Sequence, residues 1–134
     1  MKQLVYTSII DTSVDFEEIH RLLTKAVENN KKKSITGMMV YSNDYFLQCI
    51  EGEAKDIDEL FKKIVKDKRH YDIKLLGKKD IEKRYFDEWN LGFINNSKYI
   101  KKLIETKTGV KEFEPYKFDY ENARDILYKL SFMI

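Results

Sequence analysis

The stretch Asp44-Tyr45-Phe46-Leu47-Gln48-Cys49-Ile50-Glu51-Gly52 reads as a short strand that carries one polar amide in an apolar run. Alternate strand residues face opposite sides, so Phe46, Gln48 and Ile50 share one face. Both faces are apolar apart from Gln48, which is typical of a strand that is buried on both sides. A buried amide without partners costs about 1–3 kcal/mol, so Gln48 is expected to find hydrogen-bond partners.

Hydrophobic periodicity and turn signals predict the elements on either side of this strand. In chain order they are a strand over 4–10, an amphipathic helix with apolar residues from Phe16 to Val27, a strand over 35–41, the Gln48 strand, a second amphipathic helix ending near Asp67, a strand over 72–77 and a strand over 89–94. Asp15 or Ser13 is expected to cap the first helix. Asn29-Asn30 is expected to end it in the left-handed conformation, with Lys31–Lys33 as an exposed basic loop.

This order of elements predicts an α+β fold of the ferredoxin-like β-α-β-β-α-β(-β) type, with two helices on one face of the sheet. The other face is also apolar through Tyr45, Leu47 and Cys49, so a second layer is expected to cover it. Helical patterns follow over 99–104 and, after a cap at Asp119, over 120–130. We therefore expect one domain over 1–95 and a helical extension over 96–134, which packs on the sheet or in an oligomer interface.

Composition excludes several classes of protein. The chain has 134 residues, is 43% hydrophobic and 36% charged, and has a net charge of +2, which fits a globular domain better than a nucleic-acid-binding protein. One cysteine and two histidines make a disulfide impossible within the chain and argue against a zinc site. The sequence has no apolar run of about 20 residues and no signal peptide, so no membrane contact and a cytoplasmic location are expected.

Polar residues on the helix side of the predicted sheet are the candidates for function. Tyr6, Ser8, Asn30 and Gln48 can converge there, yet they contain no nucleophile–base pair. The sequence also lacks a Gly-rich phosphate loop and paired carboxylates on a buried face. Tyrosine, asparagine and glutamine donate and accept hydrogen bonds, which favours binding of a planar polar heterocycle over hydrolysis.

Five ordered blocks resemble the BLUF family, the blue-light sensors that use FAD, in its short stand-alone form. The blocks are Leu4-Val5-Tyr6-Thr7-Ser8; Asn29-Asn30 with Ile35-Thr36-Gly37; Tyr41-Ser42 with Phe46-Leu47-Gln48 and Glu51-Gly52; Asp67-Lys68-Arg69-His70; and Arg84-Tyr85-Phe86-Asp87-Glu88-Trp89. The resemblance covers residues 1–95. It implies a flavin cofactor, FAD in the first place, with FMN or riboflavin as alternatives.

The resemblance also implies which residues hold the flavin. Its ring would lie between the two helices, wedged by Leu22 and Ile64, and Asn30 would hydrogen-bond its polar edge. The remaining candidates for flavin contact are Asn29, Lys63, Asp67 and Arg69. Lys63 stands where some members have arginine. The lysine keeps the positive charge but lacks the bidentate hydrogen-bonding geometry of arginine. At Arg69 and His70, a solvated turn is expected ahead of a flavin contact.

The implied photochemistry belongs to Tyr6 and Gln48. Tyr6 would give an electron and then a proton to the photoexcited flavin, and Gln48 would rotate or tautomerise between them. A new donor to the flavin carbonyl would shift the absorption to the red until the bonds relax in the dark.

Trp89 and Leu91 are the candidate signalling residues. Leu91 departs from the methionine that is usual two residues after the tryptophan, which affects output more than flavin binding. Signalling is expected to pass to a separate, unknown partner protein from a homo-oligomer. The alternatives are a ferredoxin-like enzyme such as an acylphosphatase, whose phosphate loop is missing, and an interaction or RNA-binding module without photochemistry.

Overall fold

The computed structural model describes residues 1–95 and 97–133, apart from the side chain of Phe16, and it confirms the α+β class. Its elements are β1 (Lys2–Ile10), α1 (Phe16–Lys32), β2 (Thr36–Tyr41), β3 (Tyr45–Gly52), α2 (Ala54–Lys66), β4 (His70–Asp80), β5 (Trp89–Phe93), α3 (Lys98–Thr108), the 3₁₀ turn η1 (Pro115–Lys117) and α4 (Tyr120–Ser131). The strands form one sheet in the order β4-β1-β3-β2-β5.

The central strands β1 and β3 place the key polar residues opposite each other. They pair antiparallel, with Tyr6 across from Gln48 and Gln3 across from Glu51. β2 and β4 extend the sheet antiparallel on the two sides, and β5 joins β2 in parallel. This is the ferredoxin-like arrangement with a fifth strand added at one edge.

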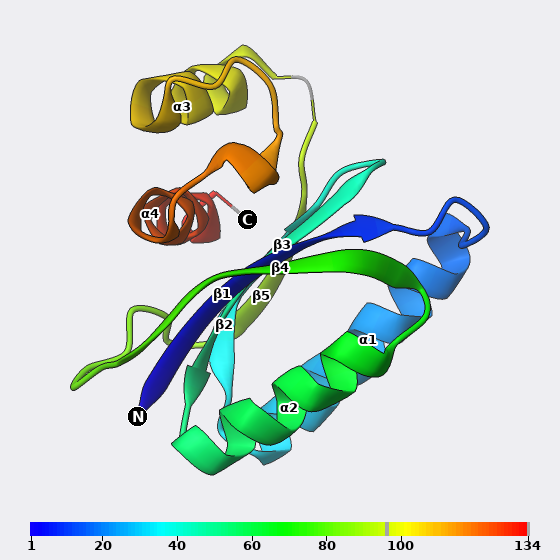
Figure 1. The fold of residues 1–134 in the computed structure, drawn as a ribbon, viewed down its shortest axis with the longest axis vertical. Coiled ribbons are helices and arrows are strands. Elements are labelled where there is room, and N and C mark those ends of the chain that lie inside the picture. The colour runs from blue at the N-terminus through cyan, green and yellow to red at the C-terminus, as the bar shows by residue number, and fades with distance from the viewer. Residues whose placement is uncertain (96, 134) are drawn as a thin grey trace.

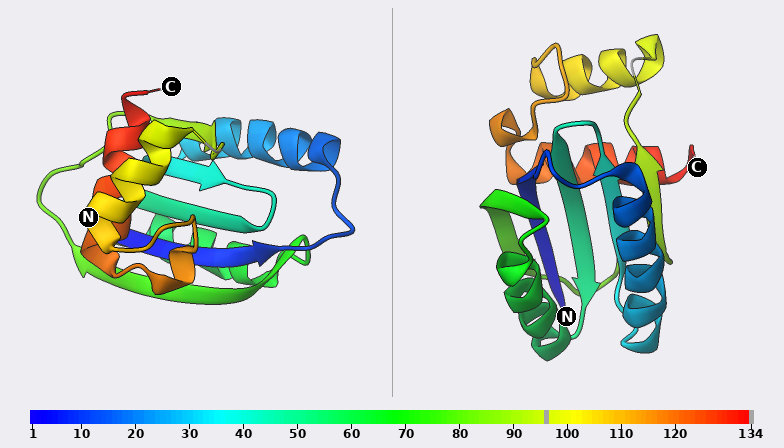
Figure 2. Two further views of the ribbon diagram at one scale, coloured as in Figure 1. Left: turned by 90° about the horizontal axis from the view of Figure 1, so that it is seen from above. Right: turned by 90° about the vertical axis from the view of Figure 1, so that its right-hand side faces the viewer.

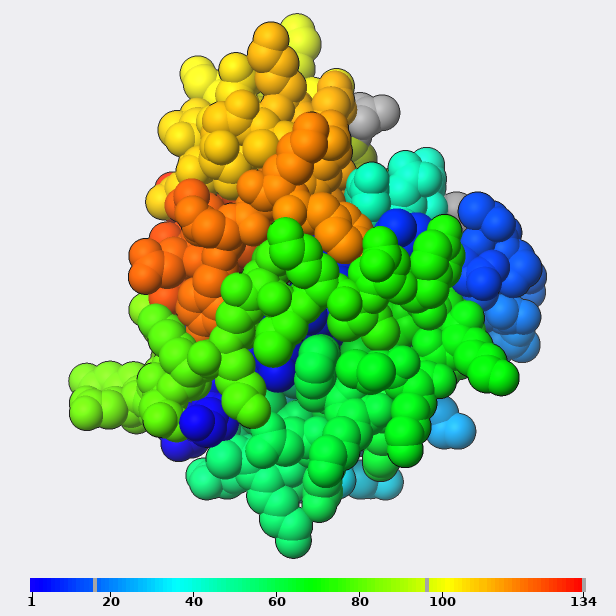
Figure 3. Space-filling model, viewed as in Figure 1, coloured from blue at the N-terminus to red at the C-terminus, as the bar shows by residue number. Residues whose placement is uncertain are grey.

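The sheet is covered on both faces (Figures 1 and 2). Helices α1 and α2 lie side by side on one face, and α3 and α4 lie on the other, as the two perpendicular views show. In Figure 3 the tail residues from α3 to α4 form a continuous mass above the rest of the molecule. The apolar face that carries Leu47 and Cys49 is therefore covered within the same chain, by a core that includes Ile126 and Leu127 of α4.

Helix α1 runs four residues beyond the predicted end at Glu28. Asp15 is its N-cap, because the Asp15 carboxylate accepts a 2.8 Å bond from the N–H of Glu18. The prediction that Asn29-Asn30 ends the helix is wrong, since both asparagines lie inside it. The left-handed residue is instead Ser34, with φ of 55°, and the basic residues Lys31 and Lys32 occupy the last turn, where the helix dipole favours them.

A buried hydrogen-bond network joins α4 to the sheet. Gln3 Nε2 donates to Glu51 Oε2 at 2.7 Å, and the hydroxyl of Tyr120 donates to Gln3 Oε1. The Glu51 carboxylate also accepts from the N–H groups of Tyr85 and Phe86, each at 2.9 Å, in the connection between β4 and β5. Gln3 and Glu51 are fully buried, so one charged group ties together two strands, a loop and, through Gln3, the last helix.

Candidate functional site

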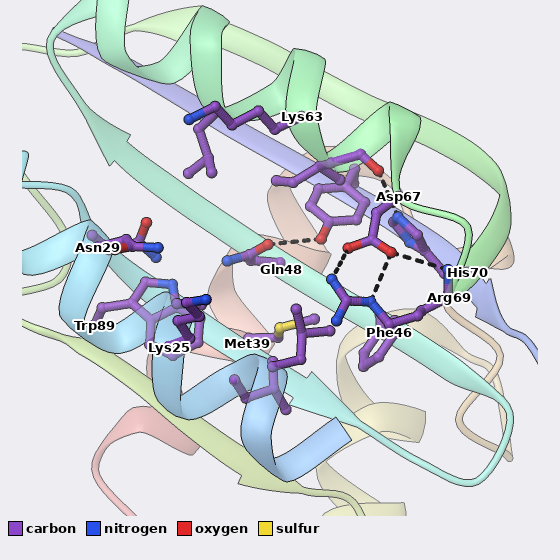
Figure 4. A pocket seen from close by; sticks show the side chains of 17 residues that line it. Lys25, Asn29, Met39, Phe46, Gln48, Lys63, Asp67, Arg69, His70 and Trp89 are labelled. Atoms are coloured by element: carbon purple, nitrogen blue, oxygen red, sulfur yellow. Dashed lines mark hydrogen bonds and ion pairs between the residues drawn. The ribbon is translucent and has the colours of Figure 1, made fainter. Parts of the chain in front are cut away.

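A cavity of about 370 Å³ lies between α1, α2 and the sheet (Figure 4). Its size falls within the range of small-molecule sites. Ten residues singled out from the sequence line it, namely Tyr6, Leu22, Asn29, Asn30, Gln48, Lys63, Ile64, Asp67, Arg69 and Trp89. Leu91 does not line the cavity and packs instead with the cluster that contains Trp89.

Sequence reasoning missed other residues of the lining, which are Leu23, Lys25, Ala26, Met39, Phe46, Leu60 and His70. Most of them are apolar residues at helical or strand spacing, and nothing in the pattern separates such a residue in a cavity wall from one in the core. Phe46 could have been predicted, because strand alternation places it on the same face as Gln48.

The hydrogen bond between Tyr6 and Gln48 lies at the wall of this cavity. Tyr6 Oη donates to Gln48 Oε1 at 2.7 Å, and both side chains are buried. The bond fixes the amide, because its oxygen faces the tyrosine and its nitrogen lies on the opposite side (Figure 4). The expected partner of Gln48 is thus the residue directly across the β1–β3 ladder.

The phenol of Tyr6 is held in its protonated form. Burial, and secondly the negative charge of Asp67, raises the pKa of Tyr6 well above its ordinary value near 10. Tyr6 therefore remains a hydrogen-bond donor at all physiological pH values, and its proton points at Gln48.

Asp67 and Arg69 form an ion pair at the end of α2. Arg69 Nε and Nη2 reach the two carboxylate oxygens of Asp67 at 2.9 and 2.6 Å, and the N–H of Arg69 adds a third bond at 3.0 Å. Hydrogen bonds from Arg69 lower the pKa of Asp67, and Asp67 in turn raises the pKa of Arg69. This bidentate geometry holds the connection into β4 in one shape beside the cavity.

The expectation that His70 lies in a solvated turn is wrong. His70 is buried, its Nδ1 lies 2.7 Å from Ser8 Oγ, and its Nε2 donates to the carbonyl of Ile64 at 2.6 Å. The carbonyl of Ile64 can only accept, so Nε2 carries a proton in this arrangement and Nδ1 lies within hydrogen-bond distance of the Ser8 hydroxyl. His70 therefore connects β1 to the end of α2, and its ring contacts Tyr6 and Phe46 edge-on.

Trp89, the first residue of β5, places an unpaired donor at the cavity. Among the described residues its Nε1 is the one buried side-chain nitrogen or oxygen without a hydrogen-bond partner. A buried N–H left unpaired costs about 1–3 kcal/mol, but this nitrogen has almost no exposed surface, so a ligand in the cavity could reach it only if the indole ring turned. A planar heterocycle, such as a flavin ring, suits the largely apolar walls that the two helices supply.

Two asparagines and a lysine complete the polar groups of the site. Asn30 is buried on α1, whereas Asn29 and Lys63 are exposed at the opening. No cluster of three or more metal-binding side chains occurs in the described part of the chain. Within residues 1–95 and 97–133, the helices are all too short or too polar to cross a membrane.

Comparison with known proteins agrees with this geometry. Residues 1–92 match the family described as sensors of blue-light using FAD, abbreviated BLUF. The solved structure of BlsA in its photo-activated state superposes with a TM-score of 0.84 at 29% identity, covering 96% of this chain and 93% of BlsA.

Two relatives extend the comparison. The photoactivated adenylate cyclase subunit alpha of Euglena gracilis is 36% identical over 66 residues, which is 49% of this chain but 6% of the cyclase. The blue light- and temperature-regulated antirepressor BluF of Escherichia coli is 27% identical over 70 residues, or 52% of this chain and 17% of the antirepressor. The match to these relatives is confined to a small part of their length. With the family matched over residues 1–92, the fold shared with BlsA and the cavity built from Tyr6, Gln48 and Trp89, this chain belongs to the BLUF family of blue-light sensors using FAD.

Proposed function

We propose that this chain is a photoreceptor, rather than an enzyme, in which the Tyr6–Gln48 hydrogen bond is the light-operated switch. The observation that carries the proposal is the buried 2.7 Å bond from Tyr6 Oη to Gln48 Oε1 at the wall of a cavity sized for a small molecule. A bound flavin supplies absorption of blue light and an excited state that accepts an electron. The residues of the chain supply everything else.

Tyr6 is the donor of the electron and the proton. Its phenol is neutral, and its proton already lies in a hydrogen bond to Gln48 Oε1, so Tyr6 would give the electron to a bound flavin and would pass on a proton by way of the Gln48 amide. His70 and Phe61 pack around the ring and hold the phenol in place.

Gln48 converts this transfer into a lasting signal. Its amide has a donor end and an acceptor end, so rotation or tautomerisation changes which of the two faces Tyr6 and which faces the cavity. The electron and the proton would return to Tyr6, and the changed hydrogen bonds of Gln48 would persist until they relax in the dark. A flavin whose carbonyl gains a hydrogen-bond donor would absorb at longer wavelength.

The two helices hold the cofactor. Leu22 of α1 and Ile64 of α2 supply apolar walls from opposite sides, and Asn30 is the buried donor and acceptor for the polar edge of the ring. Asn29, Lys63, Asp67 and Arg69 lie at the wall and opening, where they can contact the polar parts of the flavin.

Output passes through β5 to a separate partner protein. Trp89 touches the cavity, and two residues later Leu91 packs in the same cluster, so a change at Gln48 can move this edge strand. We propose that the protein acts as a homo-oligomer in the cytoplasm, where its single buried cysteine stays reduced.

The decisive experiment records absorption spectra of the purified protein in the dark, under blue light and during recovery. A flavin spectrum that shifts to the red and relaxes supports the proposal. Gln48→Leu should keep the flavin and lose the shift, and so should Tyr6→Phe. Tyr41→Phe is the matched control, because Tyr41 lies on β2 outside the cavity lining.

Two results would contradict the proposal. A red shift that survives Gln48→Leu would remove Gln48 from the switch. A purified protein that neither contains nor takes up any flavin would remove the photoreceptor function itself.

A further inference from the structure

A second hollow adjoins the cavity at its outer edge. It has a volume of about 380 Å³ and is lined by Glu18, Arg21, Leu22, Lys25 and Arg69. Leu22, Lys25 and Arg69 line both spaces, so the second hollow continues the first one over the side chain of Leu22. A molecule whose ring fills the cavity can extend its tail into this hollow.

The lining of the second hollow is rich in positive charge. Arg21 and Lys25 are one helical turn apart on α1, so they project from the same face of the helix. Arg69 approaches from the segment after α2, and Figure 4 shows Lys25 and Arg69 on different sides of the cavity. Against these three cations the lining contains a single carboxylate, Glu18.

The charges of Arg21 and Lys25 are available to a ligand. Arg69 is bonded to both oxygens of Asp67, which largely neutralises it. Arg21 and Lys25, by contrast, have no ion pair or side-chain hydrogen bond within residues 1–95 and 97–133, and both are exposed. Two unpaired cations at the exit of a flavin cavity match the chemistry of a phosphate group. The phosphate monoester of FMN carries about −1.5 to −2 charges at pH 7, and each phosphate in the diphosphate of FAD carries a single negative charge.

We propose that Arg21 and Lys25 form a phosphate subsite that makes this chain select phosphorylated flavins over riboflavin. The proposal rests on the proposed flavin function and specifies which flavins the site takes. The phosphate of FMN and the first phosphate of FAD occupy the same position relative to the ring, so both can reach the subsite.

Exposure sets the size of the expected effect. Exposed ion pairs are individually weak and are screened by salt, so two of them give a preference on the order of tenfold at low ionic strength. The preference should fall to about twofold or less at high ionic strength, where the screening length is a few ångström.

The test measures dissociation constants of riboflavin, FMN and FAD for the flavin-depleted protein by flavin fluorescence, at roughly 50 mM NaCl as low and roughly 500 mM NaCl as high ionic strength. The wild-type protein should bind FMN and FAD about tenfold more tightly than riboflavin at low salt. Arg21→Gln/Lys25→Gln should remove that preference. Arg21→Gln alone, at a residue outside the lining of the ring cavity, should weaken the preference and leave riboflavin affinity unchanged. Lys31→Gln/Lys32→Gln removes the same charge from the last turn of the same helix, outside both hollows, and should keep the preference.

Equal affinity for all three flavins in the wild-type protein would overturn the subsite, as would a preference that persists in Arg21→Gln/Lys25→Gln. Tighter binding of FAD than of FMN that is lost in the double variant supports the subsite and adds the second phosphate to it. If none of the three flavins binds, the proposed function falls together with the subsite. Riboflavin binding without a phosphate preference leaves the proposed function intact and removes only the subsite.

Discussion

Replacement of Glu51 tests whether the buried network stabilises the attachment of α4 to the sheet. In Glu51→Leu, Gln3 Nε2 and the N–H groups of Tyr85 and Phe86 all lose their acceptor. The donors of Gln3 and Phe86 are buried and that of Tyr85 is partly buried. Because a fully buried unpaired donor costs about 1–3 kcal/mol and a partly buried one less, we expect a loss of roughly 3–6 kcal/mol in the free energy of unfolding.

Glu51→Gln should be much milder. The amide oxygen can keep both backbone N–H groups, and the new NH₂ can donate to Gln3 if the Gln3 amide turns over. The hydroxyl of Tyr120, which donates to Gln3 Oε1, can then accept from Gln3 instead. Every group keeps a partner and only the charge is lost, together with its desolvation cost, so we expect a loss of about 1–2 kcal/mol.

Urea unfolding followed by far-ultraviolet circular dichroism separates the two outcomes. With a urea m-value of about 1–3 kcal/mol/M, the two variants should differ by roughly 1–2 M in their unfolding midpoints. Flavin saturation must be equal in all samples, because a ligand that binds only the folded state adds to its stability. If Leu and Gln lower stability equally, or if Leu costs less than about 1 kcal/mol, the network does not act as described.

Three further predictions follow from packing and titration. Gly77→Ala would place a Cβ atom 2.2 Å from the ring of Tyr120, so it should destabilise the protein by about 1–3 kcal/mol in thermal or urea unfolding, and Tyr120→Leu should relieve part of that loss. The free energy of unfolding should fall as pH rises above about 10, because unfolded Tyr6 ionises there while folded Tyr6, whose pKa is raised, keeps its proton. In Tyr6→Phe the slope of unfolding free energy against pH should be smaller by up to one proton released on unfolding, and an unchanged slope would contradict the buried neutral phenol. Cys49 is buried and its pKa is raised, so iodoacetamide should label it in the native protein only as fast as the protein unfolds. The urea-unfolded protein should be labelled rapidly. Fast labelling of the native protein would show that α4 leaves the sheet.

The fold and the pairing of Tyr6 with Gln48 follow closely from local patterns. Period-two alternation places Gln48 and Tyr6 on the same face of two strands, and the order of helices and strands makes those strands neighbours. The apolar second face of the Gln48 strand likewise predicts a covering layer, which α4 provides.

The parts that could not be predicted depend on contacts between distant residues or on competing local signals. His70 reads as a turn residue until the fold brings Ser8 and Ile64 against its two nitrogens. Tyr120 meets Gln3 across a separation of 117 residues. Asn29-Asn30 resembles a helix end, yet the apolar contacts of α1 carry the helix past it to Lys32.

The covering of the second sheet face by α4 bears on the transplantation of this sensor into chimeric proteins. A fusion joined directly after β5 would include every residue of the cavity but would strip the cover from Val5, Leu47 and Cys49. It would also leave Gln3 without Tyr120, on the same strand that carries Tyr6. The smallest transferable cassette therefore runs through Ser131, and an added effector is best joined beyond the end of α4. The N-terminal end is a poorer junction, because the carbonyl of Met1 already accepts a sheet-edge bond from Ile81.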